Sequence, residues 1–213
     1  MEHYPLTEWL KDRLERTLPG IAAQERMTGR ALTLPGEIPE NARQGGVLAL
    51  LYPIAERLHL LLIRRTADGG AHSGQIGFPG GKAEEQDRDI IATALREAQE
   101  EVGLLPCEVD VIGMLSPLYI PVSNFHVHPV LGFAQAQPGY ILSAAEVAEV
   151  LEVPLEELLH PERITKVVVN SPTDNSFIKK VPAYKLADET IIWGATAMMI
   201  SELQMLLEEY HAR

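Results

Sequence analysis

The chain has 213 residues, of which 46% are hydrophobic and 23% are charged, and its formal net charge is −12. This length and composition are typical of a soluble protein with one sizeable hydrophobic core. Lysine and arginine form no stripe that could follow a phosphate backbone, so we expect no nucleic acid as a partner. Every uninterrupted apolar stretch is shorter than a membrane span, so we expect no membrane association.

The single cysteine, Cys107, excludes an intrachain disulfide bond and is typical of a protein from a reducing compartment. The first five residues contain neither the basic region nor the apolar run of a signal peptide. We therefore expect a cytoplasmic protein.

The N-terminal part of the chain is predicted to form one amphipathic helix over residues 6–18, which Pro19 and Gly20 end. Residues 21–46 carry scattered glycine, proline and polar residues without a clear period, which indicates a connection along the surface. We assign residues 1–45 to this helix and connecting segment, and residues 46–213 to a single domain. The helix could cover its own core or that of a partner, so a homodimer stays open.

Short apolar or alternating runs predict the strands. Residues 47–54 and 59–65 are expected to pair as a hairpin through a turn at 55–58. The other predicted strands are 75–79, 109–115, 125–133, 150–153, 164–170, 177–185 and 190–193. Residues 118–124 are predicted to be a loop, and residues 171–175 the tip of a second hairpin.

Two further helices are predicted, over residues 88–102 and after Gly194, with a helical turn at 155–159. Asp87 is the expected N-cap of the first helix, and Gly103 suits a left-handed C-terminal cap. The apolar face of this helix should pack against a sheet and consists of Ile91, Leu95, Ala98 and Val102. Hairpin strands combined with helices predict an α+β fold with a mixed sheet.

The first helix also carries an acidic face, formed by Glu97, Glu100 and Glu101. These residues are three or four positions apart, which stacks them on one side of a helix. Like charges at this spacing destabilise a helix by roughly a few tenths of a kcal/mol per pair, so a compensating partner is expected. Hard divalent cations prefer oxygen ligands and are the economical candidate. The alternative is a solvated acidic face, which is common for an isolated Glu-x-x-Glu-Glu pattern.

Residues 81–104 resemble the Nudix box, which is entered here through Phe78-Pro79-Gly80-Gly81. The second half of the box matches at Arg96, Glu97, Ala98, Glu100, Glu101, Gly103 and Leu104. The spacing from Gly81 to Arg96 is one residue longer than in the general pattern, and Arg88 stands at the position of the first glutamate. Asp87 is the nearby acid, and we do not assign it to a metal.

Further segments resemble the coenzyme A pyrophosphatase branch of the Nudix family. They are residues 61–66, 72–75, 78–81, 119–125, 152–155 and 192–197. Ile63, Thr66 and Gly70 differ from the branch pattern, and Gly70 stands where the branch has an arginine. The resemblance implies an α/β/α sandwich, with a Nudix-like mixed sheet flanked by helices and an added N-terminal helix.

The resemblance also implies a Mg²⁺- or Mn²⁺-dependent pyrophosphohydrolase acting on a small-molecule nucleotide. Its expected reaction is the cleavage of coenzyme A to 3′,5′-ADP and 4′-phosphopantetheine. Two alternatives stay open: hydrolysis of ADP-ribose, another ADP-sugar or a dinucleotide coenzyme, and a catalytically silent nucleotide-binding module. Three intact glutamates argue against the silent module, since a binder need not keep acids that repel one another.

The expected metal ligands are Glu97 and Glu101, then Glu100, and the resemblance adds the backbone carbonyl of Gly80. Arg96 is expected to orient Glu100, four residues away, rather than to touch the substrate. A water molecule would be activated by one of these glutamates or by an acid from a later loop. The candidates for that later acid are Glu146, Glu149 and Glu152.

The candidate substrate-binding residues are Arg65, Lys82, His72 and Gly81. Arg64 and Arg65 should point to opposite faces of their strand, and Arg65 could contact a phosphate or form a surface ion pair. Lys82 has the same two alternatives, and hydrogen bonding within its loop is the favoured role of His72. His126 and His128 face one side of a strand, where packing is favoured over metal binding.

Overall fold

The computed structural model describes residues 5–28, 31–67, 74–170 and 178–213. A large mixed sheet forms the middle layer, with strands in the order β3-β2-β1-β7-β5 and with β4, β6 and β8 paired to β1, β7 and β2. The strands of this sheet are β1 (Arg43–Ile54), β2 (Arg57–Arg65), β3 (Ile76–Gly77), β4 (Gly80–Lys82), β5 (Asp110–Met114), β6 (Leu118–Ile120), β7 (Phe125–Phe133) and β8 (Val147–Pro154). A second sheet consists of β9 (Ile164–Asn170), β10 (Ile178–Lys185) and β11 (Ile191–Trp193).

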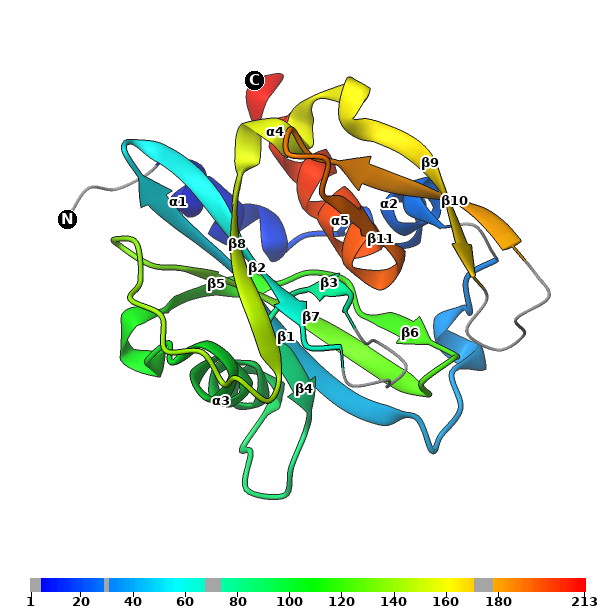
Figure 1. Cartoon of the computed structure of the whole chain (residues 1–213), viewed down its shortest axis with the longest axis horizontal. Helices are drawn as coiled ribbons and strands as arrows, with labels where there is room; N and C mark the ends of the chain where they lie inside the picture. The colour runs from blue at the N-terminus through cyan, green and yellow to red at the C-terminus, as the bar shows by residue number, and fades with distance from the viewer. Residues whose placement is uncertain (1–4, 29–30, 68–73, 171–177) are drawn as a thin grey trace.

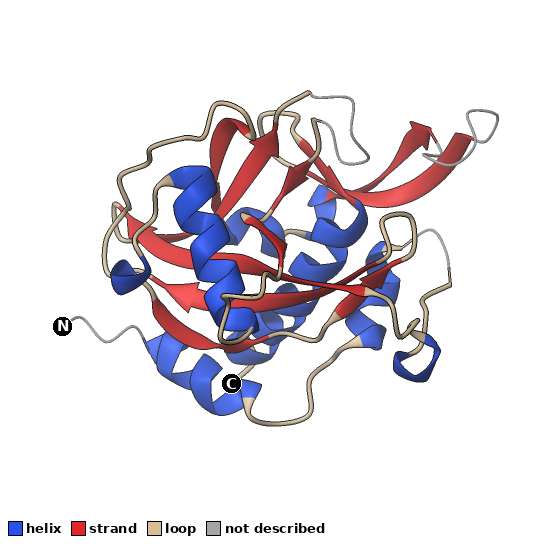
Figure 2. Cartoon of the chain, turned by 90° about the horizontal axis from the view of Figure 1, so that it is seen from below, coloured by secondary structure: helices blue, strands red, loops and turns tan. Residues whose placement is uncertain are grey.

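Helices cover both faces of the large sheet, as Figure 1 shows. The α-helices are α1 (Pro5–Leu14), α2 (Ile21–Gln24), α3 (Ile90–Val102), α4 (Leu155–Leu159) and α5 (Gly194–His211). Short 3-10 helices are η1 (Glu25–Met27), η2 (Pro35–Glu37), η3 (Pro106–Glu108) and η4 (Pro161–Arg163). Figure 2, seen from below, shows α3 lying across the near face of the sheet. Residues of α1, α4 and α5 pack together in the cluster on the other face. The predicted mixed sheet between helices is therefore confirmed.

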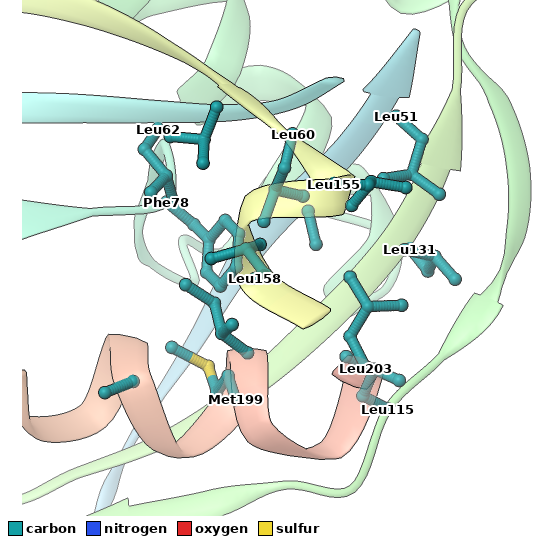
Figure 3. Close-up of a cluster of buried hydrophobic side chains, with 14 of the residues drawn as sticks. Leu51, Leu60, Leu62, Phe78, Leu115, Leu131, Leu155, Leu158, Met199 and Leu203 are labelled. Atoms are coloured by element: carbon teal, nitrogen blue, oxygen red, sulfur yellow. The ribbon is translucent and has the colours of Figure 1, made fainter. Parts of the chain in front are cut away.

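The two central strands are apolar on both faces because each face meets a helix layer. Leu48, Leu50 and Tyr52 of β1 pack with α3, whereas the intervening Ala49 and Leu51 pack with α5. In β2, Leu60 and Leu62 face the α5 side and Leu61 and Ile63 face the α3 side. Figure 3 shows the α5 side, where strand leucines meet Leu158 of α4 and Met199 and Leu203 of α5. Two-sided burial explains why these strands read as continuous hydrophobic runs.

The N-terminal helix covers the core of its own chain. Leu6 and Leu10 of α1 are buried in the same cluster as α5. Arg13 pairs with Glu209 at 2.9 Å, and the ring centroids of Trp9 and Tyr210 are 5.3 Å apart. The division at residue 45 stays a prediction. Within the described part of the chain, no helix combines the length and the apolar character that crossing a membrane requires.

Most predicted elements are confirmed, including the hairpin of β1 and β2 and that of β9 and β10. Several boundaries were wrong: α1 ends at Leu14, β8 is longer than predicted, and residues 21–46 contain α2, η1 and η2. The predicted loop at 118–124 contains β6, because the buried Leu118 brings this segment into register with β7. The predicted hairpin tip at 171–175 lies outside the described residues.

The acidic helix begins at Ile90, and its N-cap is Asp89 rather than Asp87. The Asp89 side chain accepts a hydrogen bond from the amide of Ala92 at 2.8 Å. Asp87 is unavailable as a cap because its carboxylate is bound to Arg96. Gly103 ends the helix in the left-handed conformation, with φ of 76°, as predicted.

Candidate active site

A close approach between α3 and the sheet forms the base of the site. The short strand β4 pairs with β1, which brings Gly81 opposite Gly46. A Cβ atom on Gly46 would lie 2.6 Å from the carbonyl oxygen of Ile90, at the start of α3. A Cβ atom on Gly81 would lie 2.4 Å from Oε2 of Glu97. Position 46 therefore requires glycine, because the contact is with backbone, whereas a side chain at position 81 would displace the Glu97 carboxylate that lies directly on the glycine turn.

Glu101 is the buried acid of the site, with an exposed fraction of 1%. Its Oε2 accepts a hydrogen bond from the amide of Gly80 at 2.8 Å, and its Oε1 lies 3.1 Å from Nη2 of Arg65. Burial raises the pKa of Glu101 to about 7, although Arg65 and the Gly80 amide oppose this shift. The charges of Glu97 and Glu146 raise it further. The Glu101 carboxylate is thus close to two other acids, and the charge of Arg65 offsets their repulsion only in part.

Arg65, the last residue of β2, connects Glu101 to the glycine turn. Its Nη2 also donates to the carbonyl oxygen of Gly80 at 2.7 Å. Arg64 points the other way, as strand alternation predicts, and pairs with Glu149 at 2.9 Å. The two arginines therefore differ in role: Arg64 forms a surface ion pair, and Arg65 contacts two of the predicted metal ligands.

Arg96 binds more acids than the sequence indicated. Its Nη1 donates to Glu97 at 2.9 Å and to Glu100 at 3.0 Å. Its Nε and Nη2 donate to the two oxygens of Asp87 at 2.9 and 3.0 Å. This bidentate ion pair holds the pKa of Asp87 well below its usual range. The expected contact with Glu100 is present, and the role of Asp87 was missed although an acid at this place was noted.

The three glutamates of α3 differ in their surroundings. The side chain of Glu97 is 16% exposed and that of Glu100 is 56% exposed, whereas Glu101 is buried. Burial raises the pKa of Glu97, and the adjacent Arg96 opposes that shift. Within the described chain, no three acidic, histidine or cysteine side chains already enclose a metal position.

The donor set still fits a hard divalent cation. Mg²⁺ commonly takes only one or two protein carboxylates and completes its shell with water and substrate oxygens. Glu97 and Glu101 project from consecutive turns of α3 onto the same glycine turn. Each oxygen of the paired Glu101 carboxylate keeps acceptor capacity beyond the hydrogen bond it accepts. A partly hydrated ion is therefore compatible with these residues.

Of the three candidate late acids, Glu146 is the one whose charge acts on the glutamates of α3. Its charge raises the pKa of both Glu97 and Glu101, which requires proximity to both. Glu149 is paired with Arg64 on the surface. Glu152 accepts hydrogen bonds from Tyr52 and from Gln137 instead. Glu146 is therefore the favoured candidate of the three, and its role stays a prediction.

Other predicted site residues lie elsewhere or are engaged differently. Lys82 is exposed at the end of β4, and its carbonyl oxygen accepts a hydrogen bond from Arg96 at 3.0 Å. His72 and Gly70 lie outside the described residues. The rings of His126 and His128 are 4.5 Å apart, and Nε2 of His128 lies 2.9 Å from Oε1 of Gln44. In the described residues no third ligand joins this histidine pair to form a metal-binding group.

Known proteins resemble this chain over the same region. A model of the NUDIX domain matches residues 42–170. A protein of Pectobacterium atrosepticum named Uncharacterized Nudix hydrolase NudL is 40% identical over 150 residues, which cover 70% of this chain and 76% of the relative. A protein of the same name from Cronobacter sakazakii is 38% identical over 171 residues, covering 79% of this chain and 85% of the relative.

A solved structure shares the fold. A C. elegans Ap4A hydrolase in a binary complex has a TM-score of 0.51 at 16% identity, over 80% of this chain and 96% of that one. Nudix hydrolases generally use divalent metal ions and act on small-molecule substrates. The matched region contains β1, the glycine turn, α3 and Glu146. The chain therefore belongs to the Nudix family and is a hydrolase that acts on diphosphate bonds.

Proposed function

We propose that this hydrolase cleaves the diphosphate of coenzyme A to 3′,5′-ADP and 4′-phosphopantetheine with Mg²⁺ or Mn²⁺. The arrangement of Glu97 and Glu101 around the glycine turn supports the hydrolytic part of the proposal. The resemblance of residues 61–66 and 78–81 to the coenzyme A pyrophosphatase branch supports the substrate. ADP-ribose, another ADP-sugar or a dinucleotide coenzyme is the alternative substrate.

The residues that would hold the metal are Glu97 and Glu101, with Glu100 and the carbonyl oxygen of Gly80 next. A bound divalent ion would neutralise the charge of the diphosphate and lower the pKa of a water molecule. Arg65 and the Gly80 amide fix the position of the Glu101 carboxylate. Arg65 binds the Glu101 carboxylate and the carbonyl oxygen of Gly80. Because these contacts are within the protein, we favour a positioning role for Arg65 over direct contact with a substrate phosphate.

Arg96 has the matching role for the other two glutamates, since one guanidinium nitrogen donates to both Glu97 and Glu100. Asp87 in turn holds Arg96 through two hydrogen bonds. Glu146 is exposed and its charge acts on both Glu97 and Glu101, so its carboxylate is our candidate for accepting the proton of the attacking water. In this division the glutamates bind metal or accept a proton, and the two arginines position them.

We also propose a cytoplasmic location. Cys107 is exposed and carries a free thiol. An exposed thiol is most compatible with a reducing compartment, where disulfides are rare. A homodimer stays a prediction.

The reaction is tested by incubating the protein with Mg²⁺ or Mn²⁺ and, separately, coenzyme A, ADP-ribose and a reduced dinucleotide. We expect 3′,5′-ADP and 4′-phosphopantetheine from coenzyme A, separated by chromatography. Turnover of ADP-ribose but not of coenzyme A would reject the proposed substrate. No turnover of any compound with either metal would reject the enzyme itself.

The site is tested by Glu97→Gln, which keeps the shape of the side chain and removes its charge. We expect kcat/KM to fall by about 10³-fold, because a preorganised charge at the reacting centre is lost. Glu149→Gln is the matched control, since Glu149 pairs with Arg64 outside the site. A loss below about tenfold for Glu97→Gln would reject a metal-binding role.

A further inference from the structure

The connection between β7 and β8, residues 134–146, contains no helix or strand. Long irregular connections in compact domains are uncommon and are often functional. This one ends at Glu146, the candidate late acid, whose amide donates to the carbonyl oxygen of Ser143, while the amide of Ser143 donates to the carbonyl oxygen of Glu101. Its path is set by attachments at three places along its length. We call it the 134–146 strap.

The first attachment is to Glu152 on β8. The two oxygens of Glu152 accept hydrogen bonds from Nε2 of Gln137 at 2.9 and 3.0 Å. The hydroxyl of Tyr140 donates to Oε1 of Glu152 at 3.4 Å, and that of the buried Tyr52 on β1 donates to the same oxygen at 3.1 Å. Hydrogen bonds to a charged acceptor are stronger than neutral ones. Glu152 therefore joins the strap to two strands of the sheet.

The second attachment is to the C-terminal end of α3. The amide of Ile141 donates to the carbonyl oxygen of Val102, and that of Ser143 donates to the carbonyl oxygen of Glu101, both at 2.9 Å. These carbonyls lie in the last turn of the helix, where no partner exists within the helix itself. Gly103 allows the approach, because a Cβ atom there would lie 2.8 Å from Cβ of Ile141. The strap is thus bonded to the backbone of Glu101, the residue whose carboxylate is buried.

The third attachment is next to Glu146 itself. The hydroxyl of Thr66 donates to the carbonyl oxygen of Ala145 at 2.8 Å, and the amide of Thr66 donates to the carbonyl oxygen of Glu146 at 2.9 Å. The amide of Glu146 donates to the carbonyl oxygen of Ser143, also at 2.9 Å. Thr66 directly follows Arg65 in the chain. The backbone on both sides of Glu146 is therefore tied to the strand that contacts Glu101.

We propose that the 134–146 strap positions Glu146 for hydrolysis, and that Gln137, Tyr140 and Thr66 are positioning residues that act through Glu146. The proposal rests on the proposed function, in which Glu146 accepts a proton. Gln137 and Tyr140 reach Glu152, which bonds to Tyr52 rather than to the acids of the glycine turn. Small misplacements of a reacting group are enough to slow turnover.

The strap is tested first with the double variant Gln137→Ala/Tyr140→Phe, which detaches it from Glu152. With coenzyme A and Mg²⁺ we expect kcat to fall about tenfold with KM unchanged, because both side chains bond to Glu152 and so act on the strap. Thr66→Val should cost at least as much, and Thr66→Ser, which keeps the hydroxyl, should restore the rate. Tyr184→Phe is the matched control, since it removes a buried hydroxyl bonded to Gln204 and should leave kcat unchanged. A loss expressed in KM, or an equal loss in the control, would overturn the proposal.

A second test asks whether the strap acts through Glu146. In a Glu146→Gln background, which should itself lose about 100-fold, the Gln137→Ala/Tyr140→Phe change should have no further effect. Multiplicative losses would overturn the proposal. Amide hydrogen exchange of the metal-free protein provides a readout without substrate: exchange at Ile141 and Ser143 should accelerate in the double variant. Unchanged exchange would contradict the strap itself, whereas absence of wild-type turnover would reject the proposed function.

Discussion

Glu101 and Glu202 are buried carboxylates on opposite faces of the same sheet, and their surroundings differ. Glu202 of α5 accepts hydrogen bonds from the amides of Gly20 and Ser116 at 2.8 and 2.9 Å and from the Ser116 hydroxyl at 2.7 Å. None of the ion pairs found among the described residues involves it. Glu101 has one amide donor and a partly exposed arginine, and two other acids act on it.

We interpret the difference as that between a structural carboxylate, Glu202, and a proposed metal ligand, Glu101. Donors from two distant segments, around Gly20 and Ser116, meet at Glu202, so its charge holds the N-terminal region against α5. Burial, and after it the charges of Glu97 and Glu146, raise the pKa of Glu101, and this arrangement gives the fold no benefit by itself. Strongly perturbed acids of this kind cluster at functional sites. A bound divalent cation would turn the repulsion at Glu101 into attraction.

The largest effect that would separate the two glutamates is expected for Glu101→Gln. We expect kcat/KM to fall on the order of 10³-fold, because a carboxylate at the reacting centre is lost. The melting temperature should change little, since the glutamine oxygen can still accept the Gly80 amide and Arg65, whose side chain is 33% exposed, can be solvated by water where it loses the carboxylate. Steady-state kinetics and thermal unfolding check both statements. Retained activity, or unfolding at room temperature, would contradict the functional assignment.

Asp87 supplies a third case, a nearly buried acid paired with a cation. Its side chain is 5% exposed, and Arg96 holds its pKa well below the ordinary value of about 4. The pair therefore stabilises the fold fully above about pH 4, and this contribution is lost as the pH falls toward the lowered pKa.

Asp87→Asn should accordingly lower the free energy of unfolding by about 3 kcal/mol at pH 7. Urea denaturation at pH 7 and pH 3 should show the difference from the wild type shrinking at the lower pH. Asp110→Asn, at an exposed acid bonded to Gln135, is the control and should have little effect. A difference that stays equal at both pH values would argue against the ion pair.

Much of this fold could be predicted from the sequence where local pattern and tertiary packing agree. β1 and β2 read as apolar runs because both faces of the sheet are covered. The C-terminus of α3 was predictable because Gly103 alone meets the conformational demand of the cap. The grouping of Glu97, Glu100 and Glu101 followed from helix geometry.

The missed features depend on contacts between residues far apart in the chain. The segment that leads into α2 is held by Glu202, which accepts a hydrogen bond from the amide of Gly20. Because this contact joins distant residues, the local sequence pattern did not predict α2. Asp87 and Asp89 are both good caps by residue type, and only the position of Arg96 decides between them. Glu146 could not be chosen from three acids, because the path of the 134–146 strap depends on carbonyl groups of α3.

Glu202→Gln should produce the converse of the Glu101 result. A glutamine amide would face one of three converging donors, so a buried hydrogen bond is lost and the unfolding free energy should fall by about 2 kcal/mol. The kcat/KM per folded molecule should be unchanged, since α5 lies on the face opposite the site. Denaturant unfolding and kinetics below the transition check this. A large loss of activity in a stable protein would end the distinction between the two glutamates.

The smallest effect in the series is expected for Glu100→Gln. Its side chain is 56% exposed, and Arg96 is its ion-pair partner, so the free energy of unfolding should change by less than about 1 kcal/mol. Arg96 remains bonded to Glu97 and Asp87 in this variant. If Glu100 is only an outer ligand, the Mg²⁺ concentration for half-maximal rate should rise by about tenfold, with a smaller change in kcat. A loss as large as that of Glu101→Gln would show that exposure does not rank the acids of α3, and Glu100 would then join Glu97 and Glu101 as a direct ligand.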